Sequence, residues 1–292
     1  MRTGGSRITT KISLLFDQIR WEEKILIQAA KKKRVQMNLI DARTAKIDLT
    51  SSKPQLNVEK VALQRCVSYF RGLHLAAALE NQGVTVINSH RVMQVCGNKL
   101  LSTLALTKAK IPTPKTILAF TPEAVFEALD ELGYPAILKP VVGSWGRLLA
   151  PLKDKETAEA IIEDREFMHP LYQVYYMQQM VARPPRDIRA TVIGDEVVAA
   201  IYRVSPPGEW RTNLARGGYA EQCKVTKELE DIALKAAAAV GGGVLGVDMM
   251  ESPKGLLVHE VNHTIEFKGT YTATGKDIPG MIIDYAVKQV KR

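Results

Sequence analysis

Two carboxylates and an amide lie close together in the sequence near the end of the chain, in the stretches "GVDMM" and "HEVNH". Asp248 belongs to one apolar run, and Glu260 and Asn262 alternate with apolar residues in the next. The intervening "ESPKG" has the composition of a turn, so the two runs predict a hairpin in which Asp248 lies opposite Val258. Side chains alternate between the faces of a strand, so Asp248, Val258, Glu260 and Asn262 are expected to share one face.

This predicted face gathers the hard oxygen donors that Mg²⁺ accepts while it keeps other coordination positions for water and phosphate. Without a cation the carboxylates would repel one another, and one of them would be pushed to hold a proton. The alternative is the polar outer face of an ordinary hairpin. Apolar neighbours on both faces, such as Val247 and Val261, count against that alternative. We therefore expect a metal site at Asp248, Glu260 and Asn262.

A lysine and a glycine-rich loop form a second candidate group, in "ILKPVVGSWGRL". Lys139 ends an apolar strand, and Lys99, in "CGNK", is a second candidate cation. The residues of the loop are Gly143, Ser144, Trp145, Gly146, Arg147 and Leu148. Glycines allow backbone N–H groups to approach a phosphate closely, so the group favours phosphate binding. The loop lacks the Walker pattern, and an ordinary turn is the alternative.

Arginines on two neighbouring predicted strands form the third group. Arg189 lies in "RDIR" and Arg203 in "YRV", and Asn213 and Arg216 follow in a loop. Arginines held by rigid strands can grip carboxylates or phosphates with two hydrogen bonds. The alternative is a set of surface ion pairs with the neighbouring acidic residues Asp187, Asp195 and Glu196.

The elements that must position these residues change type along the chain. Residues 11–90 alternate short strands with helices, which is typical of a parallel α/β sheet. One long helix is expected over residues 91–110, and a new pattern begins at the prolines that follow. Later strands pair as hairpins, and an amphipathic helix closes the sequence. We predict an α/β fold, α+β in its C-terminal part, with domains at residues 1–95, 96–180 and 181–292.

Composition restricts the class of protein. The chain has 292 residues, 46% hydrophobic and 24% charged, with a net charge of +9 and three scattered cysteines. These values favour a cytoplasmic globular protein that attracts acidic partners, with no membrane span. The basic cluster of residues 31–34 ends a helix that begins with acids, an order that suits the helix dipole. No aromatic residues interleave with it, so nucleic acid is not expected as a partner.

In this order along the chain, the candidate stretches resemble the ATP-grasp ligases, and within them the LysX/ArgX family. The motifs that carry the resemblance are "RCVS", "CGNK", "KPVVGSWGRL", "RDIR", "NLARGG", "GVD" and "EVNHTIEFK", spread over residues 11–292. Members of this family join 2-aminoadipate or glutamate to the amino-group carrier protein LysW. The resemblance implies an ATP-grasp fold behind a Rossmann-like pre-ATP-grasp domain, with ATP and two Mg²⁺ ions as cofactors.

The resemblance also implies a role for each candidate residue. ATP would contact Lys99, Lys139, the loop 143–148, Gln178, Gln179, Met180, Val181, Asp187 and Arg203. Gln179 stands where the family usually has a glutamate that meets adenine, so weaker adenine recognition is expected. Asp248, Glu260 and Asn262 would bind magnesium, and Arg203 and Asn262 would act in catalysis. The substrates would contact Arg189, Asn213, Arg216, Glu266, Phe267, Lys268, Gly269 and Thr270.

The choice of amino acid is expected to depend on the pair Gly269-Thr270. In the family, aminoadipate enzymes have Asn followed by Ser or Thr here, and glutamate enzymes have Gly followed by Phe. This chain has one residue of each pattern. Thr270 is small and leaves space for the longer aminoadipate side chain, and the preceding "NHT" favours the same substrate. We expect 2-aminoadipate as the main amino acid, with glutamate as a possible second one.

The implied reaction activates a carboxylate of the carrier as an acyl phosphate, which the amino acid's amine then attacks. No enzyme nucleophile is needed, in agreement with the absence of a hydrolase triad from the sequence. An acidic LysW suits the basic surface, and relatives of this kind form homotetramers or dimers. Two alternatives remain: a ligase that adds glutamate to another protein tail, and a basic binding protein without catalysis.

Overall fold

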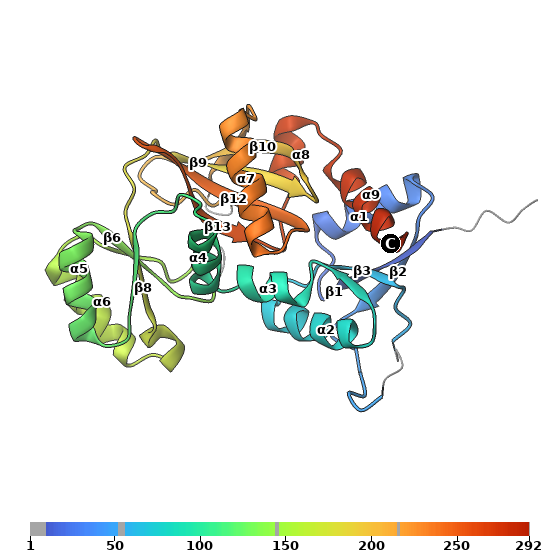
Figure 1. The fold of residues 1–292 in the computed structure, drawn as a ribbon, viewed down its shortest axis with the longest axis horizontal. Coiled ribbons are helices and arrows are strands. Elements are labelled where there is room, and N and C mark those ends of the chain that lie inside the picture. The colour runs from blue at the N-terminus through green and yellow to red at the C-terminus, as the bar shows by residue number, and fades with distance from the viewer. Residues whose placement is uncertain (1–9, 52–55, 144–145, 215–216, 292) are drawn as a thin grey trace, which may run out of the picture.

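The computed structural model describes residues 10–51, 56–143, 146–214 and 217–291. It contains three sheets, and helices pack against each of them (Figure 1). We call these parts the N-terminal layer, the central lobe and the C-terminal sheet. Across the described ranges, no helix combines the length and the apolar character that a membrane crossing requires.

The N-terminal layer is a parallel sheet with strand order β2-β1-β3-β4. Its strands are β1 (Lys11–Phe16), β2 (Gln36–Asp41), β3 (Val61–Gln64) and β4 (Thr85–Ile87). Its helices are α1 (Trp21–Lys32), α2 (Tyr69–Asn81) and α3 (His90–Cys96). The parallel sheet that the alternating pattern predicted is therefore confirmed.

Two helices occupy the region where one long helix was expected. α3 ends at Cys96, and α4 (Lys99–Lys108) begins directly after Asn98. The Asn98 side chain accepts hydrogen bonds from the backbone N–H groups of Leu100 and Leu101, which caps a new helix. The expectation of a single helix was wrong because this cap competes with continuation. The break places Lys99 at the first position of α4.

The central lobe is an antiparallel sheet with strand order β5-β8-β6-β7. Its strands are β5 (Thr116–Ala119), β6 (Ala136–Lys139), β7 (Ala150–Leu152) and β8 (Tyr175–Gln179). Its helices are α5 (Pro122–Leu132), α6 (Lys155–Glu166) and the 3₁₀ turn η1 (Pro170–Gln173). α5 begins as predicted, with the Thr121 side chain accepting from Ala124 N and proline at the first helical position.

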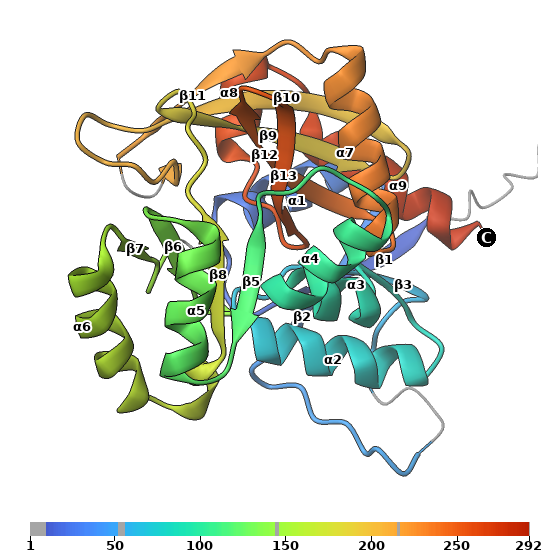
Figure 2. The ribbon, with the colours of Figure 1, turned by 60° about the vertical axis from the view of Figure 1, so that its left-hand side comes forward.

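The C-terminal sheet has the order β11-β10-β9-β12-β13 and is antiparallel throughout. Its strands are β9 (Arg186–Ile193), β10 (Glu196–Val204), β11 (Tyr219–Cys223), β12 (Val244–Ser252) and β13 (Gly255–Asn262). Its helices are α7 (Lys227–Val240) and α8 (Lys268–Thr274), and α9 (Ile278–Val290) follows. Figure 2 shows the loop between β10 and β11 lying above β6 and β7 of the central lobe.

The hydrophobic cores do not follow the order of the sheets. One core lies wholly within the central lobe and includes Val125, Leu129 and Met177. Another joins the N-terminal layer to the C-terminal sheet, because α9 packs beside α1 and also contacts β9 (Figure 1). The predicted boundaries at 95 and 180 remain a prediction, and α9 shares its core with residues from the other end of the chain.

Candidate active site

The hairpin of β12 and β13 places Asp248 directly opposite Glu260. The prediction that Asp248 faces Val258 was wrong, since the register shifts beside Asp248 and leaves His259 as an extra residue on β13. The bulge turns Val258 into the core, where it is fully buried. Asn262 nevertheless stays on the predicted face, because its Nδ2 lies 3.1 Å from Asp248 Oδ2.

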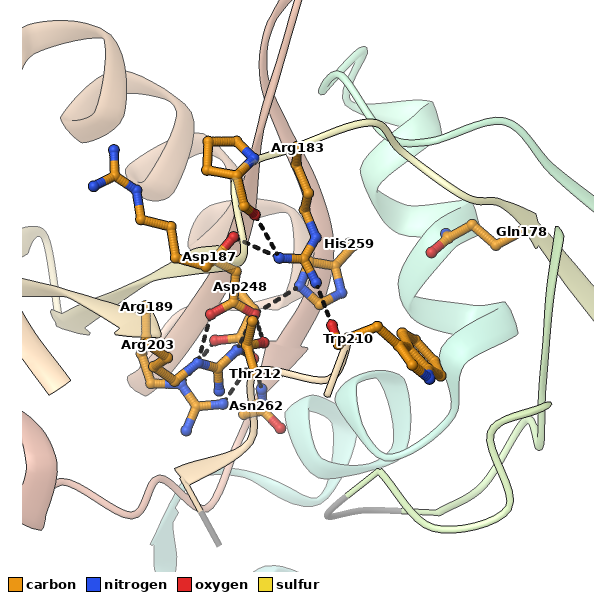
Figure 3. Close-up of polar contacts among 12 residues, drawn as sticks. Gln178, Arg183, Asp187, Arg189, Arg203, Trp210, Thr212, Asp248, His259 and Asn262 are labelled. Atoms are coloured by element: carbon orange, nitrogen blue, oxygen red, sulfur yellow. Dashed lines mark hydrogen bonds and ion pairs between the residues drawn. The ribbon is translucent and has the colours of Figure 1, made fainter. Parts of the chain in front are cut away.

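Two arginines of the neighbouring strands grip Asp248 (Figure 3). Arg189 donates through Nε and Nη2 to the two carboxylate oxygens at 2.7 Å each. Arg203 Nη2 donates to Asp248 Oδ2 at 3.0 Å. The alternative of ion pairs is confirmed for Arg203, which pairs with Asp187, but its surface location was wrong, because only 17% of the Arg189 side chain and 4% of the Arg203 side chain is exposed.

Asp187 is the second carboxylate that holds Arg203. Arg203 Nε and Nη2 donate to its oxygens at 2.7 and 2.6 Å, and the Thr212 hydroxyl also donates to Asp187. His259 Nε2 lies 3.7 Å from the same carboxylate. Asp187 is thus an interior member of the arginine network in this structure, and its contact with ribose hydroxyls stays a prediction.

The charges of this network keep its carboxylates ionised. Burial would raise the pKa of Asp187, but the charge of Arg203 and the hydrogen bonds to this carboxylate outweigh burial and lower that pKa. Burial would likewise raise the pKa of Glu260, but the positive charge of Lys99, together with more distant cations, holds that pKa at about 2. Both groups therefore present anionic oxygens at neutral pH.

The chemistry of these donors fits a magnesium ion. Asp248 and Glu260 supply carboxylate oxygens at paired positions, and Asn262 supplies an amide oxygen beside them. Within the described ranges, no group of three His, Cys, Asp or Glu side chains comes together for a metal. The candidate site therefore rests on two carboxylates and one amide. The cations that pair with Asp248 and Glu260 in the structure would share those carboxylates with the ion.

Of the two predicted lysines, Lys99 begins α4 and Lys139 ends β6 of the central lobe. Lys99 Nζ donates to the Gly143 carbonyl at 2.8 Å and lies 3.3 Å from Glu260 Oε1. Lys139 Nζ donates to Gln178 Oε1 at 2.6 Å and is buried. Burial lowers the pKa of Lys139 to about 8. Lys99 thus connects the glycine-rich loop to the predicted metal ligands.

The glycine-rich loop approaches the loop between β10 and β11. Gly146 has φ of +65°, and a Cβ there would lie 2.6 Å from Asn213 Oδ1, so only glycine suits this contact. Leu148 has φ of 57°, and its carbonyl accepts from Arg165 at 3.0 Å. Arg147 lies between these two positions. The candidates Ser144, Trp145 and Arg216 lie outside the described residues.

The predicted adenine edge lies at the end of β8. Gln178 is buried, accepts from Lys139, and donates to Thr116 Oγ1 at 3.0 Å. Gln179, the next residue, is exposed. Met180 and Val181 follow in the linker to β9, and Met180 N donates to the Pro135 carbonyl at 3.3 Å. The structure leaves these four roles as predictions.

The predicted substrate segment follows β13 and runs into α8. Phe267 is fully buried, whereas Glu266 and Lys268 are exposed. Thr270 is only 1% exposed, and its hydroxyl has no hydrogen-bond partner within the described residues. A Cβ on Gly269 would lie 2.7 Å from a methyl of Leu214. The structure therefore places the Gly269-Thr270 pair against packed neighbours.

Three residues of the network were absent from the sequence prediction: His259, at the bulge of β13, and Thr212 and Arg183. Thr212 binds Asp187 from the loop between β10 and β11. A loop has no regular spacing of residues from which such a contact could be predicted. Arg183 donates to the Arg186 carbonyl at 2.6 Å and to the Trp210 carbonyl at 2.9 Å, which ties the linker before β9 to the same loop (Figure 3). The sequence feature that could have identified Arg183 was its position before Pro184 and Pro185. These two residues have no backbone N–H to donate.

Two family descriptions match adjoining parts of the chain. The LysX preATP-grasp domain matches residues 12–95, and the RimK-like ATP-grasp domain matches residues 96–286. The chain is 35% identical over 277 residues to the glutamate–LysW ligase ArgX of Sulfurisphaera tokodaii, covering 94% of this chain and 97% of that protein. It is 38% identical over 278 residues to the alpha-aminoadipate–LysW ligase LysX of Saccharolobus solfataricus, covering 94% and 99%.

Solved structures share the fold. A RimK domain ATP-grasp protein from Sphaerobacter thermophilus superposes with a TM-score of 0.77 at 24% identity, covering 95% of this chain and 100% of that one. The ATP-grasp ligase PsnB, in a complex with a minimal precursor, Mg and ADP, superposes with a TM-score of 0.75 at 20% identity, covering 98% and 99%. The predicted ATP-grasp fold behind an N-terminal α/β domain is therefore confirmed.

Proposed function

This chain belongs to the RimK-like ATP-grasp family of ligases, and from that premise we propose that it joins 2-aminoadipate to the carrier protein LysW at the expense of ATP. The bond would form between the amino acid's α-amino group and the side-chain carboxylate of the carrier's terminal glutamate. Glutamate would be a second, poorer amino acid, and the product would enter lysine biosynthesis or, with glutamate, arginine biosynthesis.

One contact carries this proposal: Lys99 lies 3.3 Å from Glu260 while its Nζ also binds the Gly143 carbonyl of the glycine-rich loop. Cationic phosphate ligands and oxygen ligands for magnesium thus meet at one point. ATP-grasp ligases use ATP with Mg²⁺, and we infer that Asp248, Glu260 and Asn262 hold two ions here. When bound, magnesium would offset negative charge on the transferring phosphoryl group.

In the first step a carboxylate oxygen of the carrier's glutamate attacks the γ-phosphorus of ATP. The new P–O bond forms as the bond to the ADP oxygen breaks, which gives an acyl phosphate and ADP. Arg203 is held by two carboxylates, so its guanidinium is fixed in place before negative charge develops. Lys139 and Lys99 would bind the phosphates, and Gln179, Met180 and Val181 the adenine edge.

In the second step the neutral α-amine of the amino acid attacks the acyl carbon. The C–N bond forms, the C–O bond to phosphate breaks, and the nitrogen loses a proton, which gives an amide and inorganic phosphate. Arg189 and the segment from Glu266 to Thr270 would orient the amino acid. No covalent bond to the enzyme forms, so the mechanism needs no nucleophilic side chain.

The choice between the two amino acids rests on the segment that follows Asn262. Overall similarity favours neither, because relatives named for glutamate and for aminoadipate are 35% and 38% identical to this chain. The substrates differ by one methylene, which a pocket discriminates by only about 1–3 kcal/mol. Thr270, in place of a large aromatic residue, supports aminoadipate as the better substrate.

The carrier would be attracted by charge. The chain has a net charge of +9, and an acidic carrier would associate faster with such a surface at low ionic strength. Lys31 to Arg34, at the exposed end of α1, contribute to that surface.

An assay of ADP release with purified LysW tests the proposal. We expect ADP release that requires the carrier and increases with 2-aminoadipate, and less with glutamate. Mass spectrometry should find the carrier heavier by the amino acid less one water. ADP release that is unaffected by the carrier, or a carrier of unchanged mass, would refute the proposal.

A further inference from the structure

The segment that connects β13 to α8 is held almost residue by residue by the N-terminal layer. The contacts run from His263 to Asn88 and Tyr69, from Thr264 to Gln64, from Ile265 to Arg65, from Glu266 to Arg20, and from Phe267 to Trp21 and Arg65. These partners come from more than 170 residues earlier in the chain, for example 175 for Asn88 and 200 for Arg65. The segment proposed to orient the amino acid is therefore shaped by another part of the molecule.

Arg65 has the most central position among these partners. It follows β3 at the carboxyl end of the parallel sheet, and only 7% of its side chain is exposed. Its Nη1 donates to the Ile265 carbonyl at 2.9 Å, and its Nε donates to Glu23 Oε1 at 3.1 Å. Its guanidinium carbon lies 5.8 Å from the centre of the Phe267 ring.

Glu23 links Arg65 to a second arginine. The Glu23 carboxylate is fully buried and also accepts from Arg20 Nε at 3.1 Å and from Arg20 Nη2 at 3.0 Å. Arg20 Nη1 then donates to Glu266 Oε1 at 3.2 Å. Glu23 thus lies between two guanidinium groups that contact adjacent residues, Ile265 and Glu266, where the proposed substrate segment begins.

The two contacts of Arg65, with Glu23 and with the Ile265 carbonyl, depend on the planar shape of the arginine guanidinium. One guanidinium presents donors in fixed directions, so Arg65 can bind a carboxylate and a carbonyl at the same time. A lysine has the same charge on a flexible stem and cannot reproduce both directions. The Arg65 Nη2 atom is buried and has no hydrogen-bond partner within the described residues.

We propose that Arg65, held by Glu23, is a positioning residue: by fixing residues 265–267 it sets the substrate segment 266–270 for the amino-acid half of the reaction. This inference rests on the proposed function, since it assigns that segment to the amino acid. The proposal predicts that a change at Arg65 affects attack by the amino acid and leaves formation of the acyl phosphate intact. The reason is that formation of the acyl phosphate uses groups on the C-terminal sheet and the central lobe.

The variant Arg65→Lys tests the proposal in two assays on the full chain. Without amino acid, hydroxylamine traps the acyl phosphate of LysW as a hydroxamate, and we expect its rate to stay within about twofold of wild type. With 2-aminoadipate, we expect the KM for the amino acid to rise at least about tenfold while the KM for ATP is unchanged. Arg43→Lys is the matched control, since Arg43 pairs with Asp41 at an exposed site of the same layer.

Equal losses in both assays would overturn the proposal in favour of a purely structural role, and so would an unchanged KM for the amino acid. If Arg65→Lys does not fold, Arg20→Lys replaces it, because 22% of that side chain is exposed and it contacts the same segment. The same split of the two assays is expected there, with a smaller effect. A wild-type enzyme that forms no carrier-dependent hydroxamate would overturn the proposed function itself.

Discussion

The central lobe and the pair formed by the N-terminal layer and the C-terminal sheet bury their apolar side chains in different ways. Every buried residue of the lobe's core comes from residues 119–177. The core that the other two parts share combines strands β1 and β3, helices α1 and α9, and residues of β10 and β12, beside a core internal to the N-terminal layer. The central lobe buries its core within one stretch of the chain, whereas the other two parts are also joined by a core built from segments distant in sequence.

This difference suits the two regions to different roles. A lobe with its own core can change its position without exposing apolar surface, which suits the part that covers a nucleotide. The N-terminal layer and the C-terminal sheet cannot separate without opening their common core, which suits the part that holds Asp248, Glu260 and the substrate segment in place. The candidate active site lies where Lys99 and Lys139 approach Glu260.

The largest effect is expected from Glu260→Gln. Loss of this charge removes a magnesium ligand and should lower kcat for ligation by about 1,000-fold while both cores stay intact. The measurements are carrier-dependent ADP release and the midpoint of thermal unfolding. Glu251→Gln is the control, because Glu251 lies on the same hairpin and pairs with Arg186 at a partly exposed site. Normal turnover by a folded Glu260→Gln protein would disprove the assignment.

Cavities made in the two cores test the comparison directly. Leu129→Ala and Ile283→Ala each remove a fully buried side chain and should each cost about 2–5 kcal/mol of unfolding free energy. In hydrogen exchange, Leu129→Ala should reduce protection only within residues 116–179. Ile283→Ala should reduce it in both the N-terminal layer and the C-terminal sheet. A uniform loss for both variants would show that the lobe is not an independent unit.

Thr270→Phe is expected to change specificity at a moderate loss of stability. Thr270 is buried where α8 packs on β10 and β11, so the larger ring should destabilise the fold by about 1–3 kcal/mol. The kcat/KM ratio of aminoadipate to glutamate should fall by about tenfold or more. Thr272→Phe, at an exposed position of the same helix, is the control. A ratio that stays at the wild-type value would show that this position does not read the side chain.

The smallest effect concerns pH and the central lobe. The pKa of Lys139 is lowered to about 8, so its charge is lost in the free enzyme as pH rises above that value. We expect kcat/KM for ATP to fall above pH 8 by at most about tenfold per pH unit. The contribution of Lys139 to unfolding free energy has the opposite sign, rising between pH 8 and 10.5, because only the unfolded lysine still binds a proton there.

Lys139→Arg is the matched variant for this prediction. Arginine remains charged over the whole range, so the alkaline decline should disappear from the profile of kcat/KM for ATP. An identical decline in wild type and variant would assign it to another group.

Local patterns in the sequence predicted the sheets well and their junctions poorly. Alternating runs identified β12 and β13, but nothing in "ESPKGLLVHEVN" distinguishes a regular hairpin from one with a bulge at His259. The cap by Asn98 was present in the sequence, yet the apolar pattern continued across it and favoured one helix. The prediction therefore gave more weight to the continuous apolar pattern than to Asn98, whose side chain caps a new helix.

The candidate site was predictable in its residue types but not in its pairings. Asp248, Glu260 and Asn262 were expected together, whereas the salt bridges from Arg189 and Arg203 to Asp248 depend on the register of β9, β10 and β12. The burial of Thr270 and the contacts of Arg65 are also tertiary. The contact of Arg65 with Ile265 joins residues 200 positions apart, and no periodicity within one sequence records it.

The packing of α9 beside α1 affects the order in which parts of the chain can fold during synthesis. The central lobe has all its core residues once residue 177 has been made, whereas the core shared by the N-terminal layer still lacks Ile278, Ile282, Ile283 and Ala286. Strands β1 to β4 leave the ribosome first and can form one core with residues 15–93, but the core that they share with α9 must wait for the last helix. The central lobe can therefore complete its core before the N-terminal layer completes the shared one, and the growing N-terminal strands keep that apolar surface open until then.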